Sequence, residues 1–153
     1  MTSACVFVPY SVTTAATGSG DRGSSADINV PPDRAPDKVV EEKIAENQAL
    51  LYRLTGDWNP LHADPSFAKA FGFDRPILHG LCTFGFAGRA LLSSLCDDDP
   101  ARFGSVEGRF SSPVFPGEDL TTRMWVDGDE AVFTTSGGDD RVVLDAGRCT
   151  FTA

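Results

Sequence analysis

Hydrophobic positions recur at helical spacing in one long segment of the chain. A helix over residues 80–95 would have apolar side chains on nearly all of its faces, and Arg89 is its first charged residue. The pattern therefore predicts a helix buried in the core. Gly85 and Gly88 each cost about 1 kcal/mol of helix propensity. We expect that cost to be accepted because the helix has to lie close against a sheet.

Alternating and β-branched patterns follow this helix and predict strands, with turn residues rich in Gly, Pro and Asp between them. The strands are expected at 103–114, 120–126, 131–136 and 141–151. Four or five antiparallel strands after one long helix predict an α+β domain and exclude a doubly wound parallel sheet.

The segment before the long helix is expected to fold into short elements. Residues 38–44 are read as an extended piece and 45–54 as a helix that Gly56 ends. Residues 57–62 are expected to form a loop, because Pro60 has no amide hydrogen to donate and disfavours helix at the residue before it.

A further short helix is expected directly after this loop. Asp64 followed by Pro65 is a strong helix start, with the aspartate as the N-cap and the proline in the first turn. The helix should stop at Gly72.

The first part of the chain has a different composition. Residues 5–14 read as a strand, and 15–37 are rich in Gly, Ser, Asp and Pro, which is typical of a linker. We therefore divide the chain into a strand-like segment with its linker, 1–37, and one α+β domain, 38–153.

Charge and apolar content exclude several classes of function. The formal net charge is −9, so the surface should repel nucleic acid and anionic membranes. No apolar run reaches the ~20 residues that span a bilayer, and the start lacks a basic leader, so we expect a cytoplasmic protein. The spacing of Cys5, Cys82, Cys96 and Cys149 matches no metal motif, which predicts reduced thiols and no bound metal.

The residues suited to chemistry gather between 52 and 89. Both histidines of the chain, His62 and His79, lie there, and Asp57 precedes His62 by five positions. Gly80 then opens the long helix, where the dipole favours negative charge and a missing side chain leaves the amide open to a ligand. An acid, an imidazole and such a helix start are what proton transfer beside a carbonyl requires.

This stretch also resembles a known family. Residues 57–62 read D-W-N-P-L-H, as in the signature of the MaoC-like, type 2 (R-specific) enoyl-CoA hydratases, which have the hot-dog fold. The flanking T-G at 55–56, D-P at 64–65 and I-L-H-G-L at 77–81 are similar too. The resemblance extends more loosely from about residue 39 to the C-terminus and implies an antiparallel sheet wrapped around a long central helix.

The resemblance also implies roles for three residues, and two of their neighbours have expected roles of their own. Asp57 and His62 would be the catalytic pair, with the choice of base left open, and the Gly80 N–H would be an oxyanion-hole donor. Asn59 is expected to brace the loop, with ligand contact as the alternative. His79 is expected to serve the start of the helix, with substrate contact as its alternative. No cofactor is implied.

The implied activity is the reversible syn addition of water to a trans-2-enoyl-CoA in fatty-acid metabolism, which gives the (R)-3-hydroxyacyl-CoA. Two alternatives stay open: a 3-hydroxyacyl thioester dehydratase on carrier-protein or polyketide substrates, and an incomplete or non-catalytic subunit of a heteromeric hydratase.

The third alternative arises because the peroxisomal-type relatives carry two hot-dog repeats and this chain has room for one. The segment 1–37 is then either the remnant of a first repeat or an ordinary leader. A lone repeat would expose an edge and an apolar face, so we expect a homodimer or a heteromer with another hot-dog chain. An acyl-CoA substrate would also need local positive charge on this acidic protein. The candidates by position are Arg53, Lys69, Arg75, Arg89 and Arg109.

Overall fold

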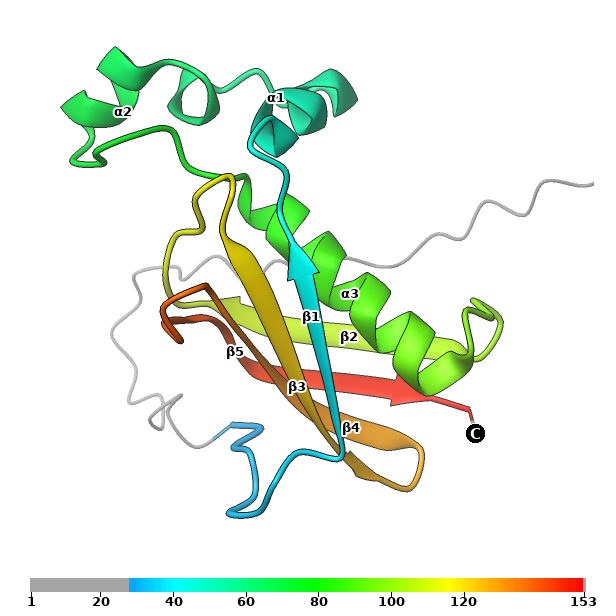
Figure 1. The fold of residues 1–153 in the computed structure, drawn as a ribbon. Coiled ribbons are helices and arrows are strands. Elements are labelled where there is room, and N and C mark those ends of the chain that lie inside the picture. The colour runs from blue at the N-terminus through cyan, green and yellow to red at the C-terminus, as the bar shows by residue number, and fades with distance from the viewer. Residues whose placement is uncertain (1–27, 153) are drawn as a thin grey trace, which may run out of the picture.

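One antiparallel sheet curls around one long helix in the computed structural model, which describes residues 28–152 (Figure 1). The five strands lie in the order β1-β3-β4-β5-β2. They are β1 (Lys38–Lys43), β2 (Phe103–Phe110), β3 (Asp119–Asp127), β4 (Glu130–Ser136) and β5 (Val142–Phe151). The α+β hot-dog fold predicted from the sequence is confirmed, while the strand expected at 5–14 lies outside the described residues.

The strand order leaves β1 and β2 at the two edges of the sheet. β1 pairs with β3 from Lys38 opposite Met124, and β2 pairs with β5 from Phe103 opposite Phe151, both antiparallel. Each edge strand therefore turns one row of backbone hydrogen-bonding groups away from its own sheet.

The long helix α3 (Gly80–Cys96) packs one face against the sheet. That face buries Ala87, Leu91 and Leu95 against a core that includes Phe133 and Leu144. The expectation of a buried helix holds for this face only, because Leu81, for example, is 47% exposed.

The expectation that Gly85 and Gly88 let the helix lie close against the sheet is wrong. A Cβ at Gly85 or Gly88 would meet no heavy atom within 4 Å, so neither marks a close approach of α3 to the described part of the sheet. Such an approach occurs at Gly80, where a Cβ would lie 3.3 Å from the Phe110 ring.

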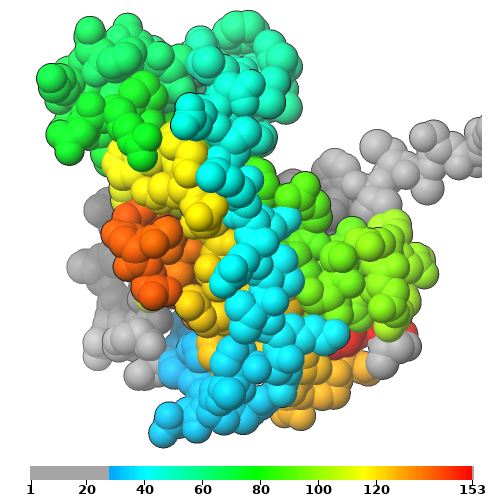
Figure 2. All heavy atoms as spheres, in the orientation of Figure 1, coloured from blue at the N-terminus to red at the C-terminus, as the bar shows by residue number. Residues whose placement is uncertain are grey.

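Short helices form a cap over the end of the sheet at which α3 begins (Figure 1). They are α1 (Gln48–Tyr52), the 3-10 turns η2 (Arg53–Thr55) and η3 (Pro60–His62), and α2 (Pro65–Ala70). Figure 2 shows this cap, cyan to green, projecting above the strands. A second apolar cluster ties it down, in which Ala49 of α1 and Cys82 of α3 share contacts with Ile44, Leu78 and Val143.

Two expected elements are shorter than their sequence patterns. The helix expected at 45–54 begins only at Gln48, because its amide bonds the Ala45 carbonyl in a tight turn. The strand expected at 103–114 ends at Phe110. One further hydrogen bond, from Ser111 N–H to Val143 O, joins this segment to β5 beyond the end of β2.

Residues 28–37 make specific contacts with the sheet before β1 begins. The Trp125 indole donates to the Arg34 carbonyl at 2.8 Å, and the Asp37 carboxylate accepts from the Val126 amide at 2.7 Å. Asn29 donates to the Ala146 carbonyl at 3.0 Å. The part of the proposed linker that is described therefore lies against β3 and β5.

Cysteines within the described residues are free and buried. They are Cys82, Cys96 and Cys149. Burial raises the pKa of each thiol, and that of Cys149 to about 12. No helix within 28–152 is both long and apolar enough to cross a membrane.

Candidate active site

The loop that carries the predicted acid is held by its own side chains. Gly56 ends η2 at a φ of 116°, a conformation that favours glycine. Asp57 Oδ1 then accepts a hydrogen bond from the Asn59 amide at 3.2 Å, and Asn59 Oδ1 accepts one from the Leu61 amide at 3.0 Å. Asn59 therefore takes part in two hydrogen bonds within the loop, and Asp57 Oδ2 takes part in neither of them.

His62 closes the 3-10 turn and turns its ring inward, where it is 8% exposed. Its Nδ1 lies 2.8 Å from the Ile77 carbonyl oxygen. A carbonyl oxygen only accepts, so Nδ1 carries the hydrogen and Nε2 keeps its lone pair in the neutral ring. The bond thus prepares Nε2 as a proton acceptor.

His79 lies against this ring rather than capping the helix that it precedes. It occupies the N-cap of α3 without a side-chain cap bond and is 2% exposed. Its ring stacks on His62 with centroids 3.7 Å apart and planes at 26°. Its Nε2 lies 3.4 Å from the Asp57 carbonyl oxygen and 3.9 Å from Asp57 Oδ2.

The structure therefore gathers Asp57, His62 and His79, each with one polar atom within 4.8 Å of the others. Such a trio could bind a metal by residue type. However, lone pairs lie in the plane of an imidazole, so two stacked rings direct them side by side rather than at one point. This geometry suits proton transfer better than chelation.

Gly80 begins α3 immediately after His79. The first hydrogen bonds of the helix run from the Cys82 and Thr83 amides to the His79 carbonyl, both at 3.1 Å. The Gly80 amide precedes them and is directed out of the helix N-terminus, where the dipole favours an anion. The expected oxyanion donor thus lies one residue from the paired imidazoles.

The pKa of His79 is lowered from its ordinary value of 6.5, first by burial and then by the neighbouring His62. Asp57 acts in the opposite direction, and Arg53 adds to the lowering. The unfolded chain therefore binds a proton at His79 more readily than the folded protein does, so acid favours the unfolded state.

We therefore expect the free energy of unfolding to fall as the pH drops below about 6.5, the pKa that His79 has when unfolded. Urea titrations across this range should show a shallower fall for His79→Gln, which has no ring to protonate. Equal slopes in the two proteins would contradict the assignment.

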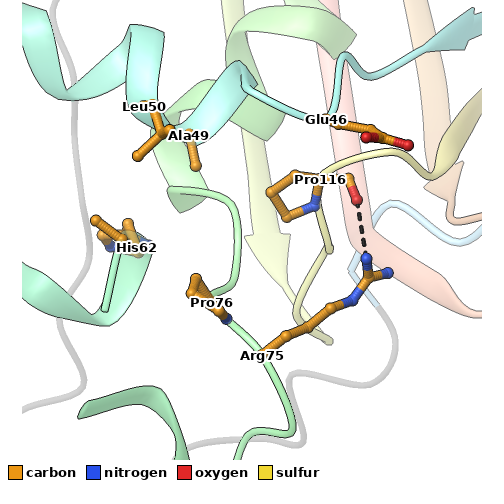
Figure 3. Close-up of a pocket in the computed structure, with 8 residues that line it drawn as sticks. Glu46, Ala49, Leu50, His62, Arg75, Pro76 and Pro116 are labelled. Atoms are coloured by element: carbon orange, nitrogen blue, oxygen red, sulfur yellow. Dashed lines mark hydrogen bonds between the residues drawn. The ribbon is translucent and has the colours of Figure 1, made fainter. Parts of the chain in front are cut away.

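A cavity of about 370 Å³ opens beside His62 (Figure 3). It lies between α1, the loop before α3 and the turn before β3. The labelled lining residues are Glu46, Ala49, Leu50, His62, Arg75, Pro76 and Pro116. Arg75 extends along one side and donates to the Pro116 carbonyl at 3.3 Å. Sequence reasoning missed Glu46, Pro76 and Pro116, because they meet only through the fold and carry no shared local motif.

The five basic candidates differ in their surroundings. Arg89 pairs with Glu42, and Arg109 pairs with Asp145 at 2.6 Å, so both already have carboxylate partners. Arg53 and Arg75 lie nearer the site, Arg53 with its guanidinium 5.3 Å from the Trp58 ring centre and Arg75 in the wall of the cavity. Lys69 lies in the last turn of α2.

Comparison with known proteins places this site in context. A family model described as MaoC like domain matches residues 27–147. The chain is 54% identical over 104 residues to "Enoyl-CoA hydratase 2, peroxisomal" of Arabidopsis thaliana, an alignment that covers 68% of this chain and 34% of that protein. It is 48% identical over 141 residues to "3-hydroxyacyl-thioester dehydratase Y" of Mycobacterium tuberculosis, covering 88% of this chain and 49% of the relative.

A solved structure is similar over most of the described chain. A MaoC-like dehydratase from Phytophthora capsici superposes with a TM-score of 0.80 at 46% identity, covering 86% of this chain and 46% of that one. The present chain thus spans between a third and a half of these relatives. The match over 27–147 nevertheless takes in the cap, the helix and nearly all of the sheet, and the chain belongs to the MaoC-like domain family.

Proposed function

We propose that this chain is the catalytic hot-dog repeat of an (R)-specific enoyl-CoA hydratase. It adds water reversibly and syn to a trans-2-enoyl-CoA and gives the (R)-3-hydroxyacyl-CoA, a step of fatty-acid β-oxidation. The observation that carries the proposal is the convergence of Asp57 and His62 beside the first turn of α3. The hydratase name of the Arabidopsis relative supports it.

The geometry supplies a way to hold and deprotonate water. Because Asp57 Oδ1 and His62 Nδ1 bond the backbone, we assign the water to Asp57 Oδ2 and His62 Nε2. A water between them loses a proton to one of the pair as its oxygen attacks C3, and the pair delivers a proton to C2 as the double bond becomes single, so both residues end in their starting protonation states. General acid and base help of this kind contributes roughly 10²–10⁴ in rate.

Negative charge gathers on the thioester oxygen as C3 is attacked. The Gly80 amide at the N-terminus of α3 is placed to donate to that oxygen, with the helix dipole adding to the effect. The absence of a side chain matters here, since the Phe110 ring already lies close to the position of a Cβ.

The cavity beside His62 is where we expect part of the thioester substrate to bind. Ala49, Leu50 and Pro76 supply apolar walls, and the imidazole forms one side. Arg53 and Arg75 flank the site and are the charges we assign to the phosphates of coenzyme A.

We also propose that the active unit contains a second hot-dog repeat, as a homodimer or in a heteromer. The chain covers 46–49% of two relatives that are named as dehydratases, and exposed apolar side chains lie on the cap, on α3 and at the end of β2. They are Leu50, Leu51, Leu54, Trp58, Phe71, Leu81 and Phe110. A partner repeat would remove this surface from water.

The test is turnover of crotonyl-CoA and longer enoyl-CoAs, followed as loss of the enoyl absorbance, with mass measured by light scattering in parallel. We expect hydration by a dimer, or by the chain with a second hot-dog chain added. A stable monomer that is fully active would refute the partner proposal, and no turnover in any assembly would refute the activity.

A second candidate is dehydration of a 3-hydroxyacyl thioester on a carrier protein, which uses the same pair in the reverse direction. The name of the Mycobacterium tuberculosis relative favours it. Comparing kcat/KM for matched CoA and carrier-protein thioesters separates the two.

We propose the cytoplasm as the location of the protein. Microscopy of a tagged full chain tests this assignment directly.

A further inference from the structure

His79 makes the second half of a reciprocal contact between two segments of the site. His62 lies in the catalytic loop and bonds the Ile77 carbonyl of the connector before α3, at 2.8 Å. His79 lies at the end of that connector, and its Nε2 approaches the Asp57 carbonyl of the catalytic loop at 3.4 Å. Each segment therefore places a histidine on a carbonyl oxygen of the other.

The rings of His62 and His79 stack on each other. Their centroids are 3.7 Å apart, and the Tyr52 ring also contacts His79, with centroids 4.6 Å apart and planes tilted by 46°. His79 is 2% exposed, so its ring has little room to rotate. The stack consequently restricts the ring plane of His62 as well.

The hydrogens on His79 follow from its neighbours. A carbonyl accepts only, so the hydrogen lies on Nε2 and faces Asp57. Nδ1 is then buried without a hydrogen-bond partner among the described residues. An unsatisfied buried nitrogen costs free energy, which makes a purely structural choice of histidine here unfavourable.

We propose that His79 is a positioning residue of the catalytic pair, which fixes Asp57 through its Nε2–H and fixes the ring plane of His62 through the stack. This inference deepens the proposed hydratase function and rests on it for the kinetic part only. His79 need not touch the substrate. Its effect is to hold the loop acid and the imidazole at one separation beside the Gly80 amide.

Two substitutions separate the two contacts. His79→Phe keeps a ring for the stack but removes the hydrogen donated to Asp57, whereas His79→Gln keeps a donor but removes the stack. We expect His79→Phe to lower kcat by about 10- to 100-fold with little change in KM, the usual scale for outer-sphere orienting partners. Melting temperatures measured for both variants establish that they are folded.

The effect of the stack on His62 can be measured by ¹⁵N NMR of its ring nitrogens, which reports the tautomer. The chain has two histidines, so in either variant His62 gives the only histidine ring signals. His79→Phe should keep the Nδ1–H tautomer of His62, and His79→Gln should shift His62 toward a mixture of tautomers.

A His79→Phe variant with the kcat of the wild type, or a His79→Gln variant with unchanged His62 tautomer, would overturn the proposal. The NMR result needs no turnover. A failure of the hydratase assignment is therefore distinguishable from a failure of the positioning role.

Discussion

Replacing Asp57 by asparagine is expected to lower kcat for enoyl-CoA hydration by about 10²–10⁴, the contribution of one general acid or base. The amide keeps an oxygen that can accept from Asn59 N–H, so the loop bond at 3.2 Å survives. The side chain is half exposed, and the change buries no new polar group. Activity should therefore fall while the melting temperature stays close to that of the wild type.

Asp64→Asn is the matched control for this variant. It makes the same chemical change seven positions later, where the side chain caps α2 by accepting from the Ser66 and Phe67 amides. Asparagine caps helices as well as aspartate does, so this variant should remain active and stable. Equal activity of Asp57→Asn and wild type would remove Asp57 from the mechanism.

His62→Gln extends the same argument to the partner in the pair. Glutamine can still donate to the Ile77 carbonyl but cannot exchange a proton near neutral pH. Residues that act as a unit give strongly non-additive losses. The double variant with Asp57→Asn should therefore be scarcely slower than either single variant, as measured by kcat/KM.

The largest expected effect on stability comes from Gly147→Ala in β5. A Cβ there would lie 2.4 Å from the Phe133 carbonyl oxygen and 2.8 Å from its ring. Phe133 is fully buried opposite Gly147 in β4, so neither the backbone nor the ring can move without separating the strands. We expect a loss of about 3 kcal/mol or more in the free energy of unfolding, which urea denaturation measures.

Gly85→Ala is the control and should act in the opposite direction. It lies inside α3, where a Cβ meets no atom within 4 Å. Alanine should therefore stabilise the helix by about 0.5–1 kcal/mol. If Gly147→Ala matched the stability of the wild type, the close pairing of β4 with β5 at this position would be wrong.

Local chemistry explains what the sequence could predict. The Asp64-Pro65 start of α2 and the left-handed Gly56 are set by residues within a few positions, and both were found where expected. The long apolar period likewise located α3 to within a residue of its end. The D-W-N-P-L-H motif directed attention to the loop that the structure places beside the start of α3.

Long-range contacts explain what the sequence could not predict. The stack of His79 on His62 joins residues 17 positions apart and depends on how the cap folds over α3. Glu46 and Pro116 reach one cavity from separate segments for the same reason. The solvent-facing side of α3 could not be foreseen either, because hydrophobicity alone does not say whether another chain covers it.

The buried thiols have a practical consequence. Cys149 is fully covered, and its pKa is raised to about 12, so at about pH 8 its sulfur is both inaccessible and protonated. A maleimide can reach it only when β5 leaves the core. The rate at which Cys149 is alkylated, measured by peptide mass spectrometry, therefore reports how often β5 separates from the sheet under native conditions.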